Sequence, residues 1–239
     1  MGAGLAIRGI LFDKDGTLID YERTWIPINR DIAAYAAGGD ADLAAELLRR
    51  FGQDPQTDAV TPGSVLAAGS IDDIAGAFAS HLGKGTPAGL AAAIDRIYSE
   101  GGAMHAVLIK GVRATLTTLK QRGFRLGVAT NDSEGGLQAS LGRADVLDLF
   151  DFAVGCDSGH GAKPGPGMGQ AFCQAVGITP SEAAMVGDAV HDLAMGRAAG
   201  FALNVGVLSG TSGREDLEDF ADLILDSVND LPAHPALSR

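Results

Sequence analysis

Two aspartates stand two residues apart directly after a short apolar run. The run covers residues 7–12, and Asp13 and Asp15 follow it, with a glycine and a threonine next. Because alternate residues of an extended chain point to the same side, both carboxylates can face one site. Asp188 adds a third carboxylate after a later apolar run. Carboxylates around a partly hydrated ion suit Mg²⁺. One carboxylate can then attack phosphorus while a second transfers the proton, so the sequence predicts phosphoryl transfer.

Three further polar residues follow other apolar runs and can hold a phosphoryl group. Thr130 and Asn131 come directly after residues 124–129, and Lys163 lies in the loop after residues 152–155. A hydroxyl and an ammonium group can donate to phosphoryl oxygens and spread their negative charge. We therefore expect Thr130, Asn131 and Lys163 to bind the phosphate of a substrate.

Alternating helix and strand patterns supply the elements that must position these residues. The expected strands cover residues 7–12, 124–129, 152–155, 183–186, 201–205 and 222–225. The expected helices between them cover about 111–122, 134–142, 167–176 and 190–199. Such alternation is typical of an α/β fold with a parallel sheet and right-handed crossovers. Ligands bind beyond the carboxyl ends of the strands in these sheets, which is where the polar residues above stand.

Residues 21–107 differ from the rest, because they carry helix signals without strand signals. A first helix is expected over about 26–37. Asp40 can cap a second helix, and Ser70 with Asp73 forms a capping-box pattern before a third.

The last helix of this segment is expected to open at Thr86-Pro87 and to stop at Gly101-Gly102. The pattern therefore predicts an all-helical insertion after the first strand. The expected domains are a core of residues 1–20 and 108–239 and a helical domain of residues 21–107.

Composition and charge restrict the partners. The chain has 239 residues, and 18 basic against 30 acidic side chains give a net charge of −12. Nucleic-acid binding needs a basic footprint, so we expect neither a nucleic-acid partner nor an anionic membrane surface. We find no apolar run of membrane-spanning length and no signal-peptide pattern, and we expect a cytoplasmic protein. Cys156 and Cys173 have no metal-type spacing and are expected to be reduced thiols in or near the core.

Four segments of the chain together resemble the motifs of the haloacid dehalogenase superfamily of phosphohydrolases. They are Asp13-Lys14-Asp15-Gly16-Thr17, Thr130-Asn131, Lys163-Pro164 and Gly187-Asp188 with Asp192 four residues on. The resemblance covers about residues 5–22 and 108–226 and includes the order and spacing of all four motifs. It implies a Rossmann-like α/β core. The helical insertion is similar to the C1 cap domain of phosphoglycolate phosphatase-like members.

The resemblance also implies a role for each matching residue. Asp13 would be the nucleophile and a ligand of Mg²⁺. Asp15 would be the general acid/base, with its backbone carbonyl on the metal. Asp188 would be the third protein ligand of the ion, and Asp192 would orient a metal-bound water or Lys163.

The implied activity is Mg²⁺-dependent hydrolysis of a small phosphorylated metabolite through an aspartyl-phosphate. A phosphosugar mutase of the same superfamily is an alternative, because it shares the core motifs. A phospho-accepting regulatory module without turnover is a second alternative, although Asp15 supplies the group that would hydrolyse an acyl phosphate. The sequence leaves the substrate and the oligomeric state open.

Other polar and aromatic residues near the motifs have weaker signals. We expect the side chain of Lys14 to be structural and Asp132 to be a surface or helix-capping charge. His191 is expected on a helix surface. His160 and Trp25 lie where they could reach the substrate, but their roles stay open.

Overall fold

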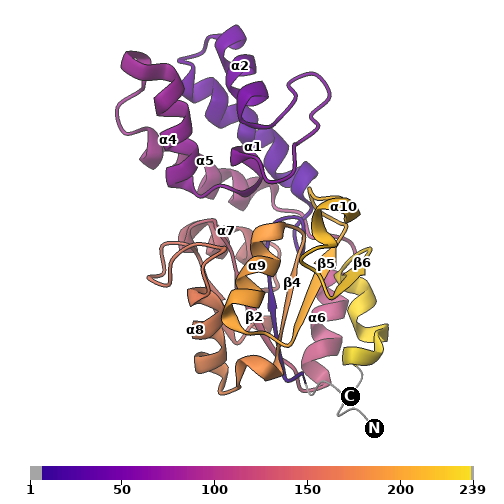
Figure 1. Ribbon diagram of the computed structural model, residues 1–239. Helices are drawn as coiled ribbons and strands as arrows, with labels where there is room; N and C mark the ends of the chain where they lie inside the picture. The colour runs from indigo at the N-terminus through magenta and orange to yellow at the C-terminus, as the bar shows by residue number, and fades with distance from the viewer. Residues whose placement is uncertain (1–6, 238–239) are drawn as a thin grey trace.

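The computed structural model describes residues 7–237 and contains one six-stranded parallel sheet (Figure 1). Its strands lie in the order β3-β2-β1-β4-β5-β6. Their bounds are β1 Gly9–Phe12, β2 Arg125–Ala129, β3 Phe152–Val154, β4 Ala183–Gly187, β5 Leu203–Val207 and β6 Leu223–Leu225. All neighbouring pairs are parallel, which confirms the predicted α/β fold with a parallel sheet.

The order of the strands places a crevice at the middle of the sheet. The chain runs outward from β1 to β2 and β3, and then crosses to β4 on the other side of β1. At such a switch point the loops leave neighbouring strands in opposite directions, which opens a ligand site beyond their carboxyl ends. The residues that follow β1 and β4 therefore border the expected site.

Helices cover both faces of the sheet. They are α6 Val112–Gln121, α7 Glu134–Arg143, α8 Gly167–Val176 and α9 Val190–Ala199, with a short α10 Arg214–Leu217 before β6. Ile10 and Phe12 of β1 share a hydrophobic cluster with α6 and α7, whereas Leu11 belongs to the cluster with α8 and α9. Alternate residues of one strand are thus buried on opposite faces, which explains the nearly continuous apolar run.

Residues 21–105 form five α-helices and a 3₁₀-helix at Gly83–Gly85, inserted between β1 and α6. The α-helices are α1 Tyr21–Ala36, α2 Ala41–Phe51, α3 Val65–Ala68, α4 Ile71–Leu82 and α5 Leu90–His105. These helices share their own hydrophobic cluster and lie together beyond one end of the sheet (Figure 1). None of the six strands of the sheet comes from this segment. Among the described residues, no helix has the length and apolar character that crossing a membrane requires.

The predicted helix caps in the insertion are confirmed, but three helix bounds were wrong. Asp40 caps α2, and Ser70 with Asp73 forms the capping box of α4. The first helix starts at Tyr21 rather than near residue 26, because Asp20 caps it.

The last helix of the insertion begins at Leu90 and not at the expected Thr86-Pro87, and it runs to His105, past the expected stop at Gly101-Gly102. The two glycines are buried inside α5. A Cβ atom on Gly101 would lie 2.6 Å from Cγ1 of Ile28 in α1. Gly101 therefore permits close helix packing and does not end the helix.

Candidate active site

Asp13 extends β1 into the crevice and contacts a buried lysine. Its backbone N–H donates to the carbonyl of Val186 in β4 at 2.8 Å, so the strand pairing continues to the site. Nζ of Lys163 lies 2.5 Å from Oδ1 of Asp13 and 2.6 Å from Oδ1 of Asp192. Burial lowers the pKa of Lys163, but the two carboxylates raise it more strongly, so the lysine is positively charged.

Asp188 brings a further carboxylate to the same place. It follows β4, and its Oδ2 accepts from the backbone N–H of Thr211 at 2.9 Å. A side chain at Gly16 would collide with this carboxylate, since a Cβ there would lie 2.7 Å from Oδ2 of Asp188. Gly16 also has a φ of 84°, which favours glycine. The glycine after Asp15 thus lets the loops after β1 and β4 come together.

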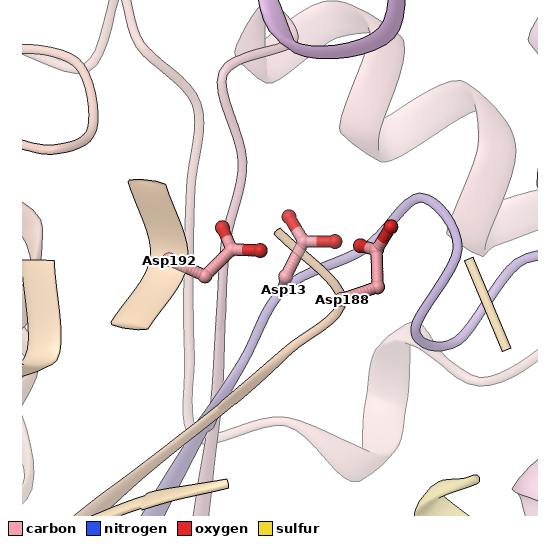
Figure 2. A group of neighbouring side chains, drawn as sticks. All are labelled: Asp13, Asp188 and Asp192. Carbon is pink, nitrogen blue, oxygen red and sulfur yellow. The ribbon is translucent and has the colours of Figure 1, made fainter. Parts of the chain in front are cut away.

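The three aspartates Asp13, Asp188 and Asp192 form one buried acidic cluster, with a ligand atom of each within 4.8 Å of the others. Figure 2 shows Asp13 between the other two, with all three carboxylates directed to the same side. Burial raises the pKa of Asp13 and of Asp188, and neighbouring carboxylates of the cluster add to both shifts. Like charges this close are costly without a cation, so the cluster could bind a metal ion.

Asp192 differs from the other two members of the cluster. Its Oδ1 accepts from Lys163 and its Oδ2 accepts from the backbone N–H of Ala189 at 3.1 Å. Although burial raises its pKa, the charge of Lys163 and these hydrogen bonds lower it below the usual value. Asp192 is therefore an anion paired with Lys163, and the oxygens best placed for a cation belong to Asp13 and Asp188.

A second buried lysine organises the environment of Asp15. Nζ of Lys14 lies 2.8 Å from Oδ2 of Asp15 and 2.9 Å from Oδ2 of Asp132. Nε1 of Trp25 in α1 donates to Oδ1 of Asp15 at 2.5 Å, and Nζ of Lys14 lies 4.6 Å from the centre of the indole. Burial raises the pKa of Asp15 to about 6 while Lys14 opposes that rise. An acid with this pKa can give and take a proton near neutral pH.

Asp132 was expected to be a surface or helix-capping charge, and this was wrong, because Ser133 is the N-cap of α7 and Asp132 is largely buried. Its side chain is 7% exposed and forms an ion pair with Lys14, whose side chain is fully buried. A fully buried ammonium group needs carboxylates that balance its charge. If Asp15 were alone, it would have to balance the charge of Lys14 and also transfer the proton. The sequence carried one usable signal, a lysine inside an otherwise buried motif, but it did not identify the partner 118 residues away.

Thr130 and Asn131 lie at the end of β2, next to the loop that carries Lys163. The hydroxyl oxygen of Thr130 accepts from the backbone N–H of Asp132 at 3.1 Å, and a hydroxyl that accepts can still donate its hydrogen. Oδ1 of Asn131 accepts from the backbone N–H of Lys163 at 2.8 Å, and its Nδ2 donates to the carbonyl of Ala68 at 3.3 Å. Asn131 thus connects the lysine loop with the helical insertion.

A cleft between the sheet and the insertion joins these residues. From the core it is lined by Asp13, Asp15, Thr130, Asn131, Asp132, Asp188, Ala189 and His191, and from the insertion by Tyr21, Trp25, Asn29, Leu66, Ala67, Ala68, Gly69, Ile71 and Tyr98. Trp25 therefore reaches the site. His191 lies on α9, with its side chain 21% exposed, and the surface that it occupies borders the cleft. His160 is not among the lining residues.

Comparison with known proteins gives consistent matches. Residues 7–200 match the family model of haloacid dehalogenase-like hydrolases. Phosphoglycolate phosphatase of Escherichia coli is 28% identical over 94% of this chain and 91% of its own. Phosphoglycolate phosphatase of Rhodospirillum rubrum is 30% identical over 90% of this chain and 89% of its own. The crystal structure of CbbY from Rhodobacter sphaeroides in complex with phosphate is similar with a TM-score of 0.68 and 25% identity, covering 94% of this chain and 96% of that one.

Proposed function

Since this chain belongs to the haloacid dehalogenase-like hydrolase family and is a phosphatase, we propose that it hydrolyses small phosphate monoesters in a Mg²⁺-dependent reaction, with Asp13 as nucleophile. One observation carries the proposal. Asp13 stands at the switch point of the sheet with a charged lysine 2.5 Å from one carboxylate oxygen and the Asp188 carboxylate beside it. The names of the relatives make phosphoglycolate one candidate substrate.

The donor set of the acidic cluster fits Mg²⁺. Asp13 and Asp188 offer hard oxygen ligands. Burial and, after it, repulsion from neighbouring carboxylates of the cluster raise the pKa of both, and a divalent cation would offset both effects. The backbone carbonyl of Asp15 is the further protein ligand that we propose. When bound, Mg²⁺ neutralises the carboxylates so that a phosphate dianion can approach them.

In the first step an Asp13 carboxylate oxygen attacks phosphorus, and the bond from phosphorus to the ester oxygen breaks. Lys163 and Thr130 hold the phosphoryl oxygens and stabilise their charge. The departing alkoxide takes a proton from the carboxylic acid of Asp15, whose raised pKa keeps part of it protonated near pH 6. The products of this step are the alcohol, the Asp13 acyl phosphate and the Asp15 carboxylate.

In the second step the Asp15 carboxylate accepts a proton from water as that water attacks phosphorus. The bond from phosphorus to the Asp13 oxygen breaks, which releases inorganic phosphate and restores the Asp13 carboxylate and the Asp15 acid. Asp192 keeps the ammonium group of Lys163 in place through both steps.

We propose that residues 21–107 act as a cap domain over a core of residues 1–20 and 108–239. Side-chain hydrogen bonds that cross between the two parts include Trp25 to Asp15, Asn131 to Ala68, and Ser133 to Asp95. Cap closure would exclude bulk water from the reacting phosphoryl group.

The test is release of inorganic phosphate from nitrophenyl phosphate by the purified protein. We expect turnover with Mg²⁺, loss of turnover in excess chelator, and recovery when Mg²⁺ is restored. Ca²⁺ should substitute poorly because it prefers more ligands and looser geometry. Full activity after exhaustive chelation would refute the metal role. Transfer of phosphate to an added sugar phosphate, without net phosphate release, would instead support the mutase.

A further inference from the structure

The part of the cleft that the insertion contributes carries no charged side chain. Its nine lining residues from the insertion are aromatic, aliphatic, glycine or amide residues. This wall faces the acidic core residues across the cleft, so it is placed to contact the alcohol part of a phosphate ester. The chemistry of this wall therefore bears on which alcohols fit.

Most polar side-chain atoms of that wall are hydrogen-bonded to other groups of the insertion. Nδ2 of Asn29 donates to Oε1 of Gln53 at 3.0 Å, and Oδ1 of Asn29 accepts from the hydroxyl of Tyr98 at 3.2 Å. The hydroxyl of Tyr21 donates to the carbonyl of Leu66 at 2.8 Å. Burial raises the pKa of both tyrosines, so their phenols are neutral. The wall thus offers neutral surface with few donors to spare for an anion.

Neither lysine of the site is free for a second anionic group, because Lys163 is assigned to the phosphoryl group and Lys14 is paired with Asp15 and Asp132. The side chains of Lys14 and Lys163 are fully buried, and each lies between two carboxylates. Neither lines the cleft, and among the described residues no arginine or lysine does. The lining does include four aspartates, which are Asp13, Asp15, Asp132 and Asp188. His191 is the one lining residue that could become cationic, and its Nδ1 lies 3.6 Å from Oδ1 of Asp192.

From this distribution we infer that the substrate is a phosphate monoester of an uncharged alcohol, and that the cleft rejects esters with a second anionic group. The inference rests on the proposed phosphatase function and specifies its substrate class, which excludes the phosphoglycolate that the names of the relatives make a candidate. The phosphoryl group has its own partners in Lys163, Thr130 and the metal site. A carboxylate or second phosphate on the alcohol would lie against the neutral wall of the insertion, which offers no counter-charge.

The first experiment compares esters that differ only in this charge. The pairs are glycerol phosphate with phosphoglycerate, and hydroxyethyl phosphate with phosphoglycolate, since each replaces a neutral CH₂OH by a carboxylate of similar size. We expect kcat/KM to be roughly 10²-fold higher for the neutral member of each pair, because burying an anionic group without a partner against a neutral wall is strongly disfavoured. The same four esters are also measured as competitive inhibitors of nitrophenyl phosphate turnover, and the neutral members should inhibit at lower concentration.

The second experiment adds the missing cation. Ala67 lines the cleft from the insertion, is half-buried and takes no part in the proposed chemistry. Ala67→Lys should raise the turnover of phosphoglycerate relative to glycerol phosphate about tenfold or more, as a new ion pair across a cleft can do. The matched control Ala67→Gln has a similar length without charge and should leave that ratio unchanged. Thermal melting and circular dichroism verify that both variants fold.

The outcomes separate this inference from the function on which it rests. If nitrophenyl phosphate is hydrolysed but phosphoglycolate and phosphoglycerate are used or bound as well as their neutral partners, the inference is wrong and the phosphatase function stands. In that case His191→Gln shows whether the histidine binds the carboxylate. If no ester is hydrolysed with Mg²⁺, the proposed function and the inference both fail.

Discussion

The site contains two buried lysines, and each is held between two aspartates. Lys163 lies between Asp13 and Asp192, and all three residues come from the core. Lys14 lies between Asp15 and Asp132. The pKa of both lysines is raised, because the paired carboxylates outweigh the effect of burial. Each cluster therefore contains one buried ammonium group and two carboxylates, so the two have the same charges.

They differ in what the insertion contributes. The cluster around Lys163 is complete without it, whereas Asp15 also accepts a hydrogen bond from Trp25, which belongs to α1. The proposed nucleophile is thus preorganised by the core, while the environment of the proposed proton donor depends on where the insertion lies. The core alone therefore positions the proposed nucleophile, whereas the insertion also positions the proposed proton donor.

The largest effect is expected for the nucleophile itself. Asp13→Asn replaces the attacking carboxylate with a poor nucleophile of the same shape, so no acyl phosphate forms and turnover vanishes. The measurement is phosphate release together with intact-protein mass after a brief acid quench with nitrophenyl phosphate and Mg²⁺. A phosphate adduct on this variant, or retained turnover, would assign the nucleophile elsewhere.

Removing the lysine of the same cluster should affect both turnover and stability. Lys163→Met leaves Asp13 and Asp192 buried without their shared cation, which costs about 3–5 kcal/mol of unfolding free energy. Urea unfolding in chelator measures this loss. The double variant Lys163→Met with Asp192→Asn removes one stranded charge, so it should recover part of the stability but none of the turnover. Equal stability of the single variant and the wild-type protein would show that the cluster is not held by these ion pairs.

The sequence was sufficient to predict the order of the core elements and the residues at the strand ends. Those predictions rest on local signals. Examples are the apolar run that stops at Asp13 and the alternation of helix and strand patterns. The roles of Asp13, Asp15, Thr130, Lys163 and Asp188 stay predictions that the experiments here address.

The partners across the sheet could not be predicted, for a physical reason. Whether Lys14 turns inward depends on finding two counter-charges, and one of them, Asp132, comes from the neighbouring strand end. Likewise Gly101 is a helix stop by propensity but a packing residue in the structure, because α1 approaches it closely. Both cases are decided by tertiary contacts that local sequence does not contain.

Replacing the proton donor should slow the reaction without preventing attack. Asp15→Asn should reduce turnover on the order of 10²–10⁴-fold, the usual loss when acid/base assistance is removed. With nitrophenyl phosphate the first step needs little protonation, so Asp13 is still phosphorylated and the adduct persists because water lacks its base. Quenched intact mass should therefore show the adduct in Asp15→Asn and not in Asp13→Asn. Wild-type turnover in Asp15→Asn would remove this residue from the mechanism.

Substitutions of the two charged neighbours of Asp15 should shift the pH dependence of kcat/KM in opposite directions. Asp15 protonates the alcohol in its acid form, so kcat/KM for an alkyl ester falls as pH rises through a pKa of about 6. Lys14→Met removes the cation that lowers this pKa, so the fall should move to higher pH. Asp132→Asn removes a carboxylate that raises it, so the fall should move to lower pH. Shifts in the same direction for both variants would contradict the electrostatic coupling to Asp15.

The smallest effect is expected for Trp25, whose replacement tests whether the insertion contributes to the proton transfer. Trp25→Phe keeps a ring between Lys14 and Tyr98 but removes the N–H that donates to Oδ1 of Asp15. We expect a loss of about three- to tenfold in kcat for hydroxyethyl phosphate, in line with the roughly 0.5–1.5 kcal/mol net value of one hydrogen bond. Nitrophenyl phosphate should be affected less, because its leaving group needs little protonation. The matched control Tyr98→Phe removes a hydroxyl from the same wall that bonds to Asn29 and not to Asp15, so it should change both substrates equally. If Trp25→Phe also slows both substrates equally, the indole is only a packing group, and the acid is positioned by the core alone.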